Sequence, residues 1–178
     1  MALEPQFTKS IPDGDNRRRR VCDHCGFVQY DNPRVIVGAI VRHGDKVLLC
    51  RRAIHPRKGY WTIPAGFMEL GETPDAGARR EAYEEACAVI ETGDLLAVYT
   101  IAHLSQVQIF YRAILTDPAI AAGDESLEVG LFGWDEIPWD DIAFPSVTWA
   151  LEHDRDVHSG KATAPFENPR GETGAVSE

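Results

Sequence analysis

The chain has 178 residues and a formal net charge of −10, with 44% hydrophobic and 26% charged residues. This length fits one full-sized domain with a small appendage and excludes two large domains, and the composition is that of a globular protein with a buried core. The negative charge disfavours nucleic acid and anionic membranes as partners, so a polyanionic small molecule would need bound cations to approach.

Residues 1–34 hold a basic run at Arg17–Arg20, one CxxC pair at Cys22 and Cys25, and several turn signals. They show little apolar periodicity, which predicts a small irregular N-terminal module. The basic run is interpreted as a solvated face without a function.

From Val35 the chain becomes rich in β-forming residues. The runs "RVIVGAIVRH" and "KVLLCRRA", joined by a Gly-Asp pair, predict a β-hairpin. The longest uncharged apolar stretch, Val35–Val41, falls far short of the ~20 residues needed to cross a bilayer, and no secretory signal opens the chain. We therefore expect a cytoplasmic protein without a membrane partner, and the isolated Cys50 and Cys87 agree with a reducing compartment.

A loop rich in proline and glycine, "HPRKGYWTIPAG", leads to the clearest helical pattern in the chain. Thr73 as the N-cap and Pro74 at the first helical position predict a helix over 74–88. One face of that helix carries a stripe of small apolar residues suited to packing against a sheet, namely Ala78, Ala82, Ala86 and Val89.

The same helix gathers carboxylates. Glu81, Glu84 and Glu85 fall within one arc of about 100°, and Gly77 lies in that arc and leaves room for a close approach. Like charges at these spacings repel, so we expect a cation among them. Carboxylate oxygens suit Mg²⁺ or Mn²⁺, whereas the alternative is a solvated, glutamate-rich helix face. The turn "IPAGFMELGE" favours the metal site, because it brings backbone carbonyls beside the helix N-terminus.

Beyond the helix, "LLAVYTIAHL" and "VQIFYRAIL" predict two strands, and a short strand is expected near "VGLFGW". "SVTWALEHDRDVH" has the apolar spacing of an amphipathic helix. After Ser159 the composition turns to Gly, Pro, Thr and Glu, which predicts a partly disordered tail. The expected organisation is a module over 1–34, an α/β domain with a mixed sheet over 35–158, and a tail over 159–178.

The stretch from Gly66 to Ala88 resembles the Nudix box, and this chain fills all of its charged positions. The box consists of a glycine, five residues, Glu, seven residues, Arg-Glu, an apolar residue, any residue, Glu-Glu, any residue, glycine and an apolar residue. Here Cys87 replaces the last glycine, which bears on the end of the helix more than on metal chemistry. The charged positions are Glu72, Arg80, Glu81, Glu84 and Glu85.

The resemblance implies an α/β/α sandwich with a mixed central sheet, preceded by a degenerate zinc-ribbon-like module. It also implies a metal-dependent enzyme. Glu81, Glu84 and Glu85 would be the metal carboxylates, and the carbonyl of Ala65 would be a further ligand. The expected reaction is Mg²⁺-dependent hydrolysis of the diphosphate bond of a nucleoside diphosphate linked to a group X.

Two further roles follow from the same resemblance. Glu72 and Arg80 would form a structural salt bridge. Glu128 lies where many members hold another acidic residue that binds metal or acts as the base, and the alternative is a charge on the rim of a strand.

Sequences around the box bear on the identity of X. The stretch that begins with "VCDHCGF" resembles members that carry a zinc ribbon before the hydrolase domain. "WTIPAGFMELGE", with Ala65, and "ESLEVGLFGWDEIPWDDIAFPSV" are similar to the branch with FAD and ADP-ribose diphosphatases. We therefore expect cleavage of FAD to FMN and AMP, or of ADP-ribose to AMP and ribose 5-phosphate. NADH diphosphatase, whose usual marker is missing, and a non-catalytic nucleotide-sensing regulator are the alternatives. The family habit implies a homodimer.

Basic and aromatic residues near the box loop are candidate substrate contacts as a group, although each one also suits packing or a solvated surface. The basic residues, suited to phosphate, are Arg51, Arg52, Arg57 and Lys58. The aromatic residues, suited to stacking on adenine or flavin, are Tyr60, Trp61, Phe67 and Tyr99.

The N-terminal cysteine pair is an incomplete zinc site. Structural zinc takes four ligands, whereas this chain offers Cys22 and Cys25, with His24 poorly placed between them. Three interpretations stay open: the module folds without metal, two chains share one zinc ion through two pairs, or the pair is a bare thiol turn. Cys50 and Cys87 are interpreted as core packing.

Overall fold

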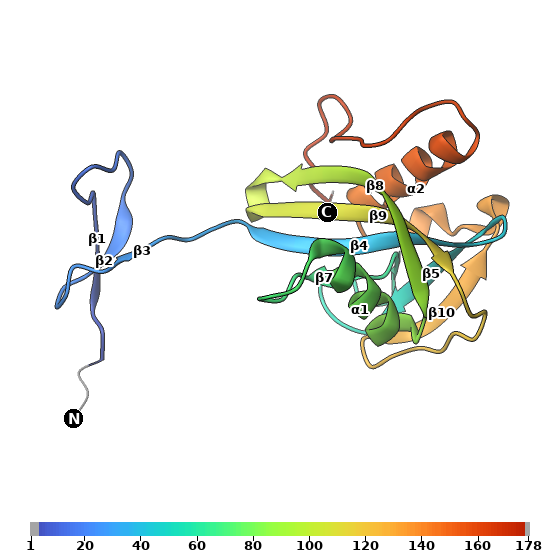
Figure 1. The fold of residues 1–178 in the computed structure, drawn as a ribbon, viewed down its shortest axis with the longest axis horizontal. Helices are drawn as coiled ribbons and strands as arrows, with labels where there is room; N and C mark the ends of the chain where they lie inside the picture. Colours follow the sequence, from blue (N-terminus) through green and yellow to red (C-terminus); the bar gives the residue numbers. More distant parts are fainter. Residues whose placement is uncertain (1–3, 177–178) are drawn as a thin grey trace. The chain divides into compact units, whose positions relative to one another are not determined.

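The computed structural model describes residues 4–176, which form two compact units divided between Pro33 and Arg34. The first unit is a three-stranded antiparallel sheet in the order β1-β2-β3 (Figure 1). Its strands are β1 (Phe7–Ser10), β2 (Arg19–Cys22) and β3 (Val28–Gln29). The irregular module that the sequence predicts therefore contains a sheet. Strands this short, with mostly exposed side chains, leave no alternating apolar pattern.

The second unit contains a seven-stranded mixed sheet, as the sequence predicts. The main order is β10-β5-β4-β9-β8, with β6 paired to β5 and β7 paired to β4. The pair β4–β9 is parallel, and the other neighbours are antiparallel. The strands are β4 (Arg34–His43), β5 (Lys46–Arg52), β6 (Trp61–Thr62), β7 (Ala65–Phe67), β8 (Ile90–Ile101), β9 (Gln106–Leu115) and β10 (Ser126–Phe132).

The predicted hairpin of β4 and β5 is present, but its strands separate soon after the turn. They pair only at Arg42–Val47 and His43–Lys46. Segment 61–67 fills the gap, because β6 pairs with β5 while β7 pairs with β4. A Cβ on Gly38 would lie 2.6 Å from the carbonyl oxygen of Pro64, so glycine is required for this close approach. Segment 61–67 thus lies as a wedge between β4 and β5 and carries the backbone of the box loop into the middle of the sheet.

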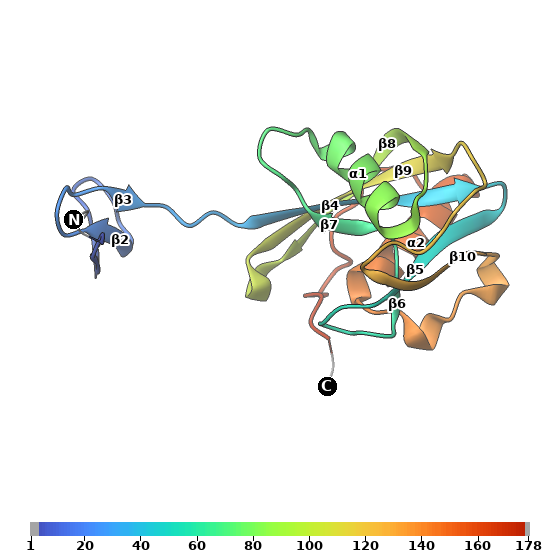
Figure 2. The same ribbon diagram turned by 90° about the horizontal axis from the view of Figure 1, so that it is seen from below.

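Two helices cover opposite faces of the sheet and complete the α/β/α sandwich (Figures 1 and 2). Helix α1 (Pro74–Ala86) packs its alanines on one face, and helix α2 (Pro145–His158) packs Trp149 and Leu151 on the other. Short 3₁₀ helices follow β8 and β10, at Ala102–Leu104, Trp134–Glu136 and Trp139–Asp141. Within residues 4–176, neither α-helix is long and apolar enough to cross a bilayer.

A buried ion cluster fixes α2 on its face of the sheet. Asp154 is fully buried and accepts a hydrogen bond from Nε of Arg42 at 2.6 Å and from Nε of Arg112 at 2.8 Å. The free-energy cost of burying this carboxylate is offset by its charge-assisted hydrogen bonds to the two guanidinium groups. This cluster belongs to the face opposite α1.

Helix α1 ends two residues earlier than the sequence predicts, because Cys87 takes the left-handed conformation with φ of 48°. The N–H of Cys87 donates to the carbonyl of Tyr83 at 2.8 Å, which is the single bond of the αL capping motif, and that of Ala88 donates to Ala82 at 3.1 Å. Two expectations at this end are wrong. Cys87 is exposed rather than in the core, and Val89 lies outside the buried alanine stripe because it follows the turn.

We predict that Cys87→Gly stabilises the protein. A residue with a Cβ pays a steric cost at positive φ that glycine avoids, so the free energy of unfolding should rise by about 1 kcal/mol. Thermal melts should show an increase in Tm of roughly 2–4 °C. The matched control is Cys87→Ala, which keeps the Cβ and should give no increase. Equal Tm values for the glycine and alanine variants would contradict the strain at this position.

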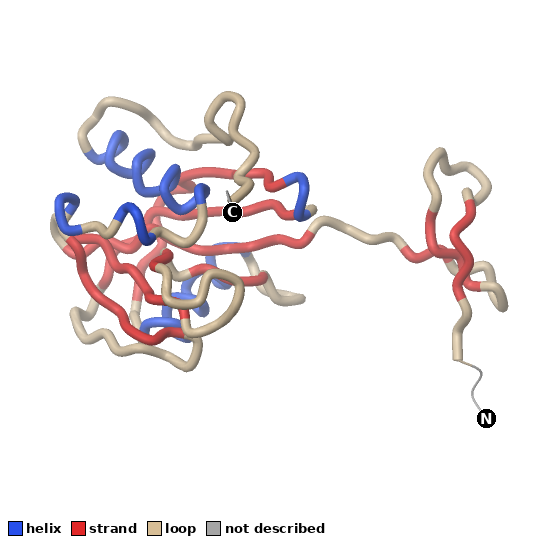
Figure 3. The backbone as a smooth tube through the Cα atoms, turned by 180° about the vertical axis from the view of Figure 1, so that it is seen from behind, coloured by secondary structure: helices blue, strands red, loops and turns tan. Residues whose placement is uncertain are grey.

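The segment after α2 is ordered where the sequence predicts a partly disordered tail (Figure 3). Phe166 exchanges backbone hydrogen bonds with Leu96 and Val98 of β8, both at 2.9 Å. The ring of His153 stacks on that of Phe166 with centroids 4.0 Å apart. The polar composition does not reveal this docking, because it depends on one partly buried aromatic ring, Phe166, and on hydrogen bonds to the edge strand β8.

Candidate functional site

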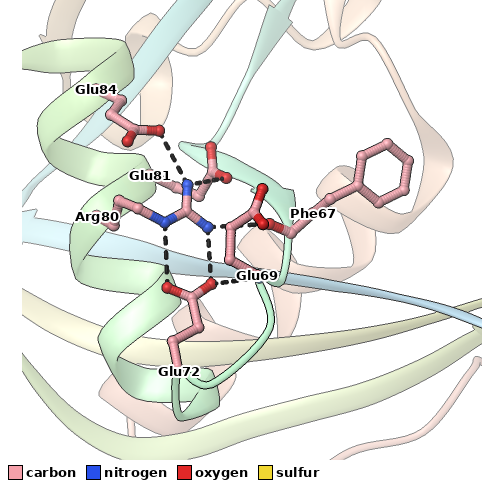
Figure 4. A network of polar contacts seen from close by, with 6 residues as sticks. All are labelled: Phe67, Glu69, Glu72, Arg80, Glu81 and Glu84. Carbon is pink, nitrogen blue, oxygen red and sulfur yellow. Dashed lines mark hydrogen bonds and ion pairs between the residues drawn. The ribbon is translucent and has the colours of Figure 1, made fainter.

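The guanidinium group of Arg80 is the centre of a polar network at α1 (Figure 4). Its Nε and Nη2 donate to the two oxygens of Glu72 at 3.1 and 2.8 Å. Its Nη1 donates to Glu81 at 2.7 Å and to Glu84 at 2.9 Å, and Nη2 also reaches the carbonyl of Phe67 at 2.9 Å. The ion pair of Glu72 and Arg80 that the resemblance implies is therefore present, and it extends to two further carboxylates.

Glu72 ties the box loop to the helix. The backbone N–H of Glu69 donates to Glu72 at 2.7 Å, and the hydrogen bonds from Arg80 lower the pKa of Glu72. A Cβ on Gly77 would lie 2.6 Å from a methyl of Val37 and 2.7 Å from Glu72. The sequence predicts that Gly77 leaves room for a close approach within the carboxylate arc. In the structure, Val37 of β4 and the side chain of Glu72 occupy that space.

Two of the three box glutamates on α1 are buried. Glu81 is 8% exposed and Glu85 is 6% exposed, while Glu84 is exposed. Burial raises the pKa of Glu81. Burial, followed by the nearby charge of Glu81, raises the pKa of Glu85 to about 8, although Arg52 opposes this shift. Oε2 of Glu85 is buried and has no hydrogen-bond partner among the described residues. A buried carboxylate oxygen without a donor is costly unless a cation completes its coordination.

The turn at Ala65 and Gly66 brings the main chain against these carboxylates. A Cβ on Gly66 would lie 2.4 Å from both oxygens of Glu81, so only glycine fits here. The backbone N–H of Ala65 lies close enough to Glu85 to lower its pKa. Two buried carboxylates, one oxygen without a donor and an adjacent main chain form an oxygen-rich donor set that suits Mg²⁺ or Mn²⁺.

The carboxylates do not form a ready-made cluster, however. Among residues 4–176, no three Cys, His, Asp or Glu side chains stand in a metal-holding arrangement. In Figure 4 the Nη1 atom of Arg80 lies between Glu81 and Glu84 and bonds to both. Glu81 and Glu84 are therefore both bound to Arg80 in this arrangement, and Glu85 is the one of the three that makes no ion pair among the described residues.

A loop before β10 caps the end of α1 and brings a further acid to the site. The N–H of Gly123 donates to the carbonyl of Glu85 and that of Ala121 donates to Ala86, both at 3.0 Å. The charge of Glu125 raises the pKa of both Glu81 and Glu85, and Glu125 belongs to the loop that contacts the end of α1 through Gly123. No sequence pattern singles out Glu125, because its position depends on this loop and not on a spacing within the box.

Glu128 does not join the carboxylates. Along β10, Val129 and Leu131 pack on the α1 side and Phe132 packs on the α2 side. Glu128 shares the α2 side by strand alternation, and its carboxylate lies 3.6 Å from Arg51. The expectation that Glu128 supplies the extra acidic group is therefore not met by its position, which matches the alternative of a charge on a strand rim.

The basic residues of the box loop do not lie together on one side of the sheet. Arg52 lies on the carboxylate side, where its charge lowers the pKa of Glu85. Arg51 pairs with Glu128 on the other face, and Nε of Arg57 donates to the carbonyl of Ala143 at 3.1 Å. Lys58 is exposed. Of the four candidate phosphate contacts, the structure brings only Arg52 to the glutamates.

The four aromatic candidates separate in the same way. Trp61 and Tyr99 are core residues, and the ring of Tyr60 lies under the guanidinium of Arg57, 4.1 Å away. Phe67 is 49% exposed, and the guanidinium of Arg34 lies 5.4 Å from its ring. Phe67 is thus the most exposed ring of this group, but it joins the Arg80 network through its carbonyl, and its ring points away from the carboxylates (Figure 4).

The thiols of the N-terminal sheet lie in one tight turn. Cys22 is 6% exposed and Cys25 is exposed. The backbone N–H groups of His24 and Cys25 lower the pKa of the Cys22 thiol, and the thiol of Cys25 adds to the shift.

The box geometry agrees with comparisons to known proteins. Residues 32–150 match the model of the NUDIX domain, and residues 5–31 match a zinc-ribbon model described as Nudix N-terminal. The chain belongs to the NUDIX family. It is a Nudix hydrolase with all of the charged box residues, and a degenerate zinc ribbon precedes the hydrolase domain in the sequence.

Three relatives illustrate the range of this family. An ADP-ribose pyrophosphatase of Methanocaldococcus jannaschii is 30% identical over 113 residues, covering 61% of this chain and 67% of the relative. An NAD-capped RNA hydrolase, NudC, of Edwardsiella ictaluri is 39% identical over 67 residues, covering 38% of this chain and 26% of the relative. The crystal structure of a NUDIX hydrolase from Nitrosomonas europaea is 47% identical with a TM-score of 0.87, covering 91% of this chain and 93% of that one.

The buried state of Glu85 predicts a pH-dependent cost to stability in the metal-free protein. Its pKa rises from an ordinary 4.5 to about 8 on folding. Between these values the folded state keeps a proton that the unfolded state releases, so stability falls as pH rises through this window. Glu85→Gln removes the titration. Its Tm advantage over the wild type in EDTA should be smallest at pH 5, grow up to pH 8 and then level off.

Thermal melts at pH 5, 6, 7, 8 and 9 measure this trend. Glu128→Gln is the matched control, because its carboxylate is exposed and paired with Arg51 on the other face. A Tm difference for Glu85→Gln that does not change with pH would contradict the assignment of the raised pKa to Glu85.

Proposed function

We propose that this protein hydrolyses the diphosphate bond of a nucleoside diphosphate linked to a second group, with Mg²⁺ or Mn²⁺ as cofactor and ADP-ribose as the first candidate substrate. The observation that carries this proposal is the buried pair Glu81 and Glu85, with an oxygen that lacks a donor, packed against the backbone at Gly66. A permanently buried pair of this kind destabilises the fold, which is understandable if it exists to hold a cation.

The residues that would hold the ion are Glu81, Glu84, Glu85 and the carbonyl of Ala65. Bound there, a divalent cation supplies neutralisation of phosphate charge and a more acidic water molecule. Arg52, on the same side as Glu85, is placed to bind a phosphate oxygen.

Arg80 has a positioning role in this proposal. Its two bonds to Glu72 fix the box loop, while its Nη1 orients Glu81 and Glu84. We assign proton acceptance to a carboxylate oxygen of Glu125, because this side chain is exposed, its charge acts on both buried glutamates, and its loop contacts α1. Glu128, three residues further along, faces the other side of the sheet and takes no part.

ADP-ribose leads because the archaeal relative, matched over two thirds of its length, carries the name ADP-ribose pyrophosphatase. FAD shares the AMP half of ADP-ribose and is the next candidate. Hydrolysis of NAD-capped RNA is a second candidate function, which the similarity to the NudC protein over 67 residues supports. NADH stays the alternative small substrate.

A substrate panel tests the proposal. The protein is incubated with Mg²⁺ and ADP-ribose, FAD, NADH or NAD-capped RNA, and AMP or cap release is followed by chromatography. We expect AMP and ribose 5-phosphate from ADP-ribose with the highest kcat/KM, and no release in EDTA. A higher kcat/KM for FAD, NADH or capped RNA would overturn the choice of substrate. Release from none of them by a protein that binds Mn²⁺ would overturn the enzymatic proposal and favour a nucleotide sensor.

A further inference from the structure

The N-terminal unit lacks a core that could hold it together. Among residues 4–33, Cys22 is the only buried side chain. Phe27 is 60% exposed and Tyr30 is 58% exposed, so the largest apolar side chains of the unit contribute little to burial. Domains below about 40 residues usually need disulfides, a metal or oligomerisation to fold. Something other than apolar packing within one copy must stabilise this sheet.

Ion pairs within the unit do not replace a core. Arg19 binds Asp15 at 2.9 Å and its guanidinium lies 5.0 Å from the ring of Tyr30. Arg20 reaches Asp31 at 3.4 Å. Pairs near the surface contribute little, because water screens them and ordering long side chains is unfavourable. A cross-link through the cysteine turn is the remaining way to stabilise the sheet.

The turn at Cys22 is built as one half of a zinc site. The N–H of Cys22 donates to the carbonyl of Phe27 at 2.8 Å, and the N–H of Gly26 donates to the carbonyl of Cys22 at 2.9 Å. Gly26 takes φ of 73°, which closes the turn directly after Cys25. Such a turn presents two sulfur atoms to one point, as a tetrahedral zinc site requires from each pair of ligands.

The second half of the site is missing from this copy. Residues 1–33 contain Cys22, Cys25 and His24 as zinc-binding side chains, and His24 is part of the turn itself. A four-ligand ribbon, as the family model implies, therefore does not fit one chain. Cys50 is buried in the α1 core and cannot complete it.

We propose that two copies of this chain share one zinc ion, each supplying Cys22 and Cys25. This arrangement gives the ion four thiolates in tetrahedral geometry and gives each sheet the cross-link that it lacks. A second copy seated at the turn also covers Phe27, which follows the turn directly and is exposed in the single chain. The shared ion makes a homodimer contact that is separate from the glutamates of α1.

Zinc content and sulfur coordination of the full-length Cys87→Ser variant test this proposal. Cys87 is exposed and Cys50 is 1% exposed, so the turn of Cys22 and Cys25 is the one place in the variant with an exposed thiol, that of Cys25. After purification with added Zn²⁺, we expect 0.5 zinc ions per chain and four sulfur ligands at about 2.3 Å by X-ray absorption. Half an ion per chain with four sulfurs requires two copies.

Cys25→Ser is the variant that should lose the bound zinc. It should retain less than a tenth of the wild-type zinc while hydrolysis of the nucleotide substrate stays within twofold, so failure here is distinguishable from failure of the proposed function. One zinc ion per chain, fewer than four sulfur ligands, or no zinc in Cys87→Ser would each overturn the shared site.

Discussion

Glu85→Gln is expected to lower kcat/KM for ADP-ribose by about 10²-fold or more while leaving the fold intact. The amide has almost the shape of the carboxyl group but cannot carry the negative charge that a divalent cation needs. Because Glu85 is buried and already prefers its neutral form, the substitution should not lower Tm. Initial rates of AMP release with saturating Mg²⁺, together with a thermal melt, measure both effects. Glu81→Gln should behave similarly, since Glu81 is the other buried carboxylate of the pair.

The matched pair Glu125→Gln and Glu128→Gln locates the additional acidic group. Both residues are exposed and stand three positions apart, yet only Glu125 influences the buried glutamates. The Glu125 variant should lose activity and the Glu128 variant should stay within twofold of the wild type. Near-normal turnover for both Glu81→Gln and Glu85→Gln would refute the assignment of the box glutamates, and a loss confined to Glu128→Gln would refute the face assigned to that residue.

Gly123→Ala is expected to disturb both stability and activity. A Cβ at this position would lie 1.7 Å from the carbonyl oxygen of Glu84, and backbone cannot yield as a flexible side chain can. The loop must move away from α1, which breaks the hydrogen bonds of Gly123 to Glu85 and of Ala121 to Ala86. Overpacking of this kind costs about 1–3 kcal/mol. Each kcal/mol corresponds to a Tm decrease of roughly 2–4 °C in a protein of this size.

Activity should fall with the loop, because Glu125 follows Gly123 by two residues and would be displaced from the buried pair. The control is Gly93→Ala, where the added Cβ would meet only the carbonyl of Arg112 at 3.4 Å, an ordinary contact. Calorimetry and initial rates on the two variants separate the outcomes. If Gly123→Ala matched Gly93→Ala in Tm and rate, the loop would not depend on this contact.

Features that depend on local periodicity were predictable from the sequence. Helix α1 begins at Pro74 as predicted, and the alanine stripe from Ala78 to Ala86 is buried. The hairpin turn of β4 and β5 was also predictable, because it follows from two β-rich runs and a Gly-Asp pair. The wedge formed by segment 61–67 was not, since it fills a gap that exists only once β4 and β5 separate.

The site shows the same division between local and tertiary information. The spacing of the box predicts Glu81, Glu84 and Glu85 on one arc of the helix. It does not predict that Arg80 binds two of them, or that β4 and Glu72 pack against Gly77 in the same arc. The choice between Glu125 and Glu128 depends on a loop that caps α1 and on a register shift at the start of β10. Neither is encoded in a short motif.

Counting bound Mn²⁺ by electron paramagnetic resonance tests the proposed metal site most directly. The wild type, Glu85→Gln and Glu128→Gln are titrated with Mn²⁺ at pH 8.5, where the buried carboxyl can lose its proton, and Mg²⁺ is then added in competition. We expect the wild type and Glu128→Gln to bind Mn²⁺ equally, with displacement by Mg²⁺, and Glu85→Gln to bind at least about tenfold more weakly. Equal Mn²⁺ affinity of the wild type and Glu85→Gln would contradict a metal site at the buried glutamates.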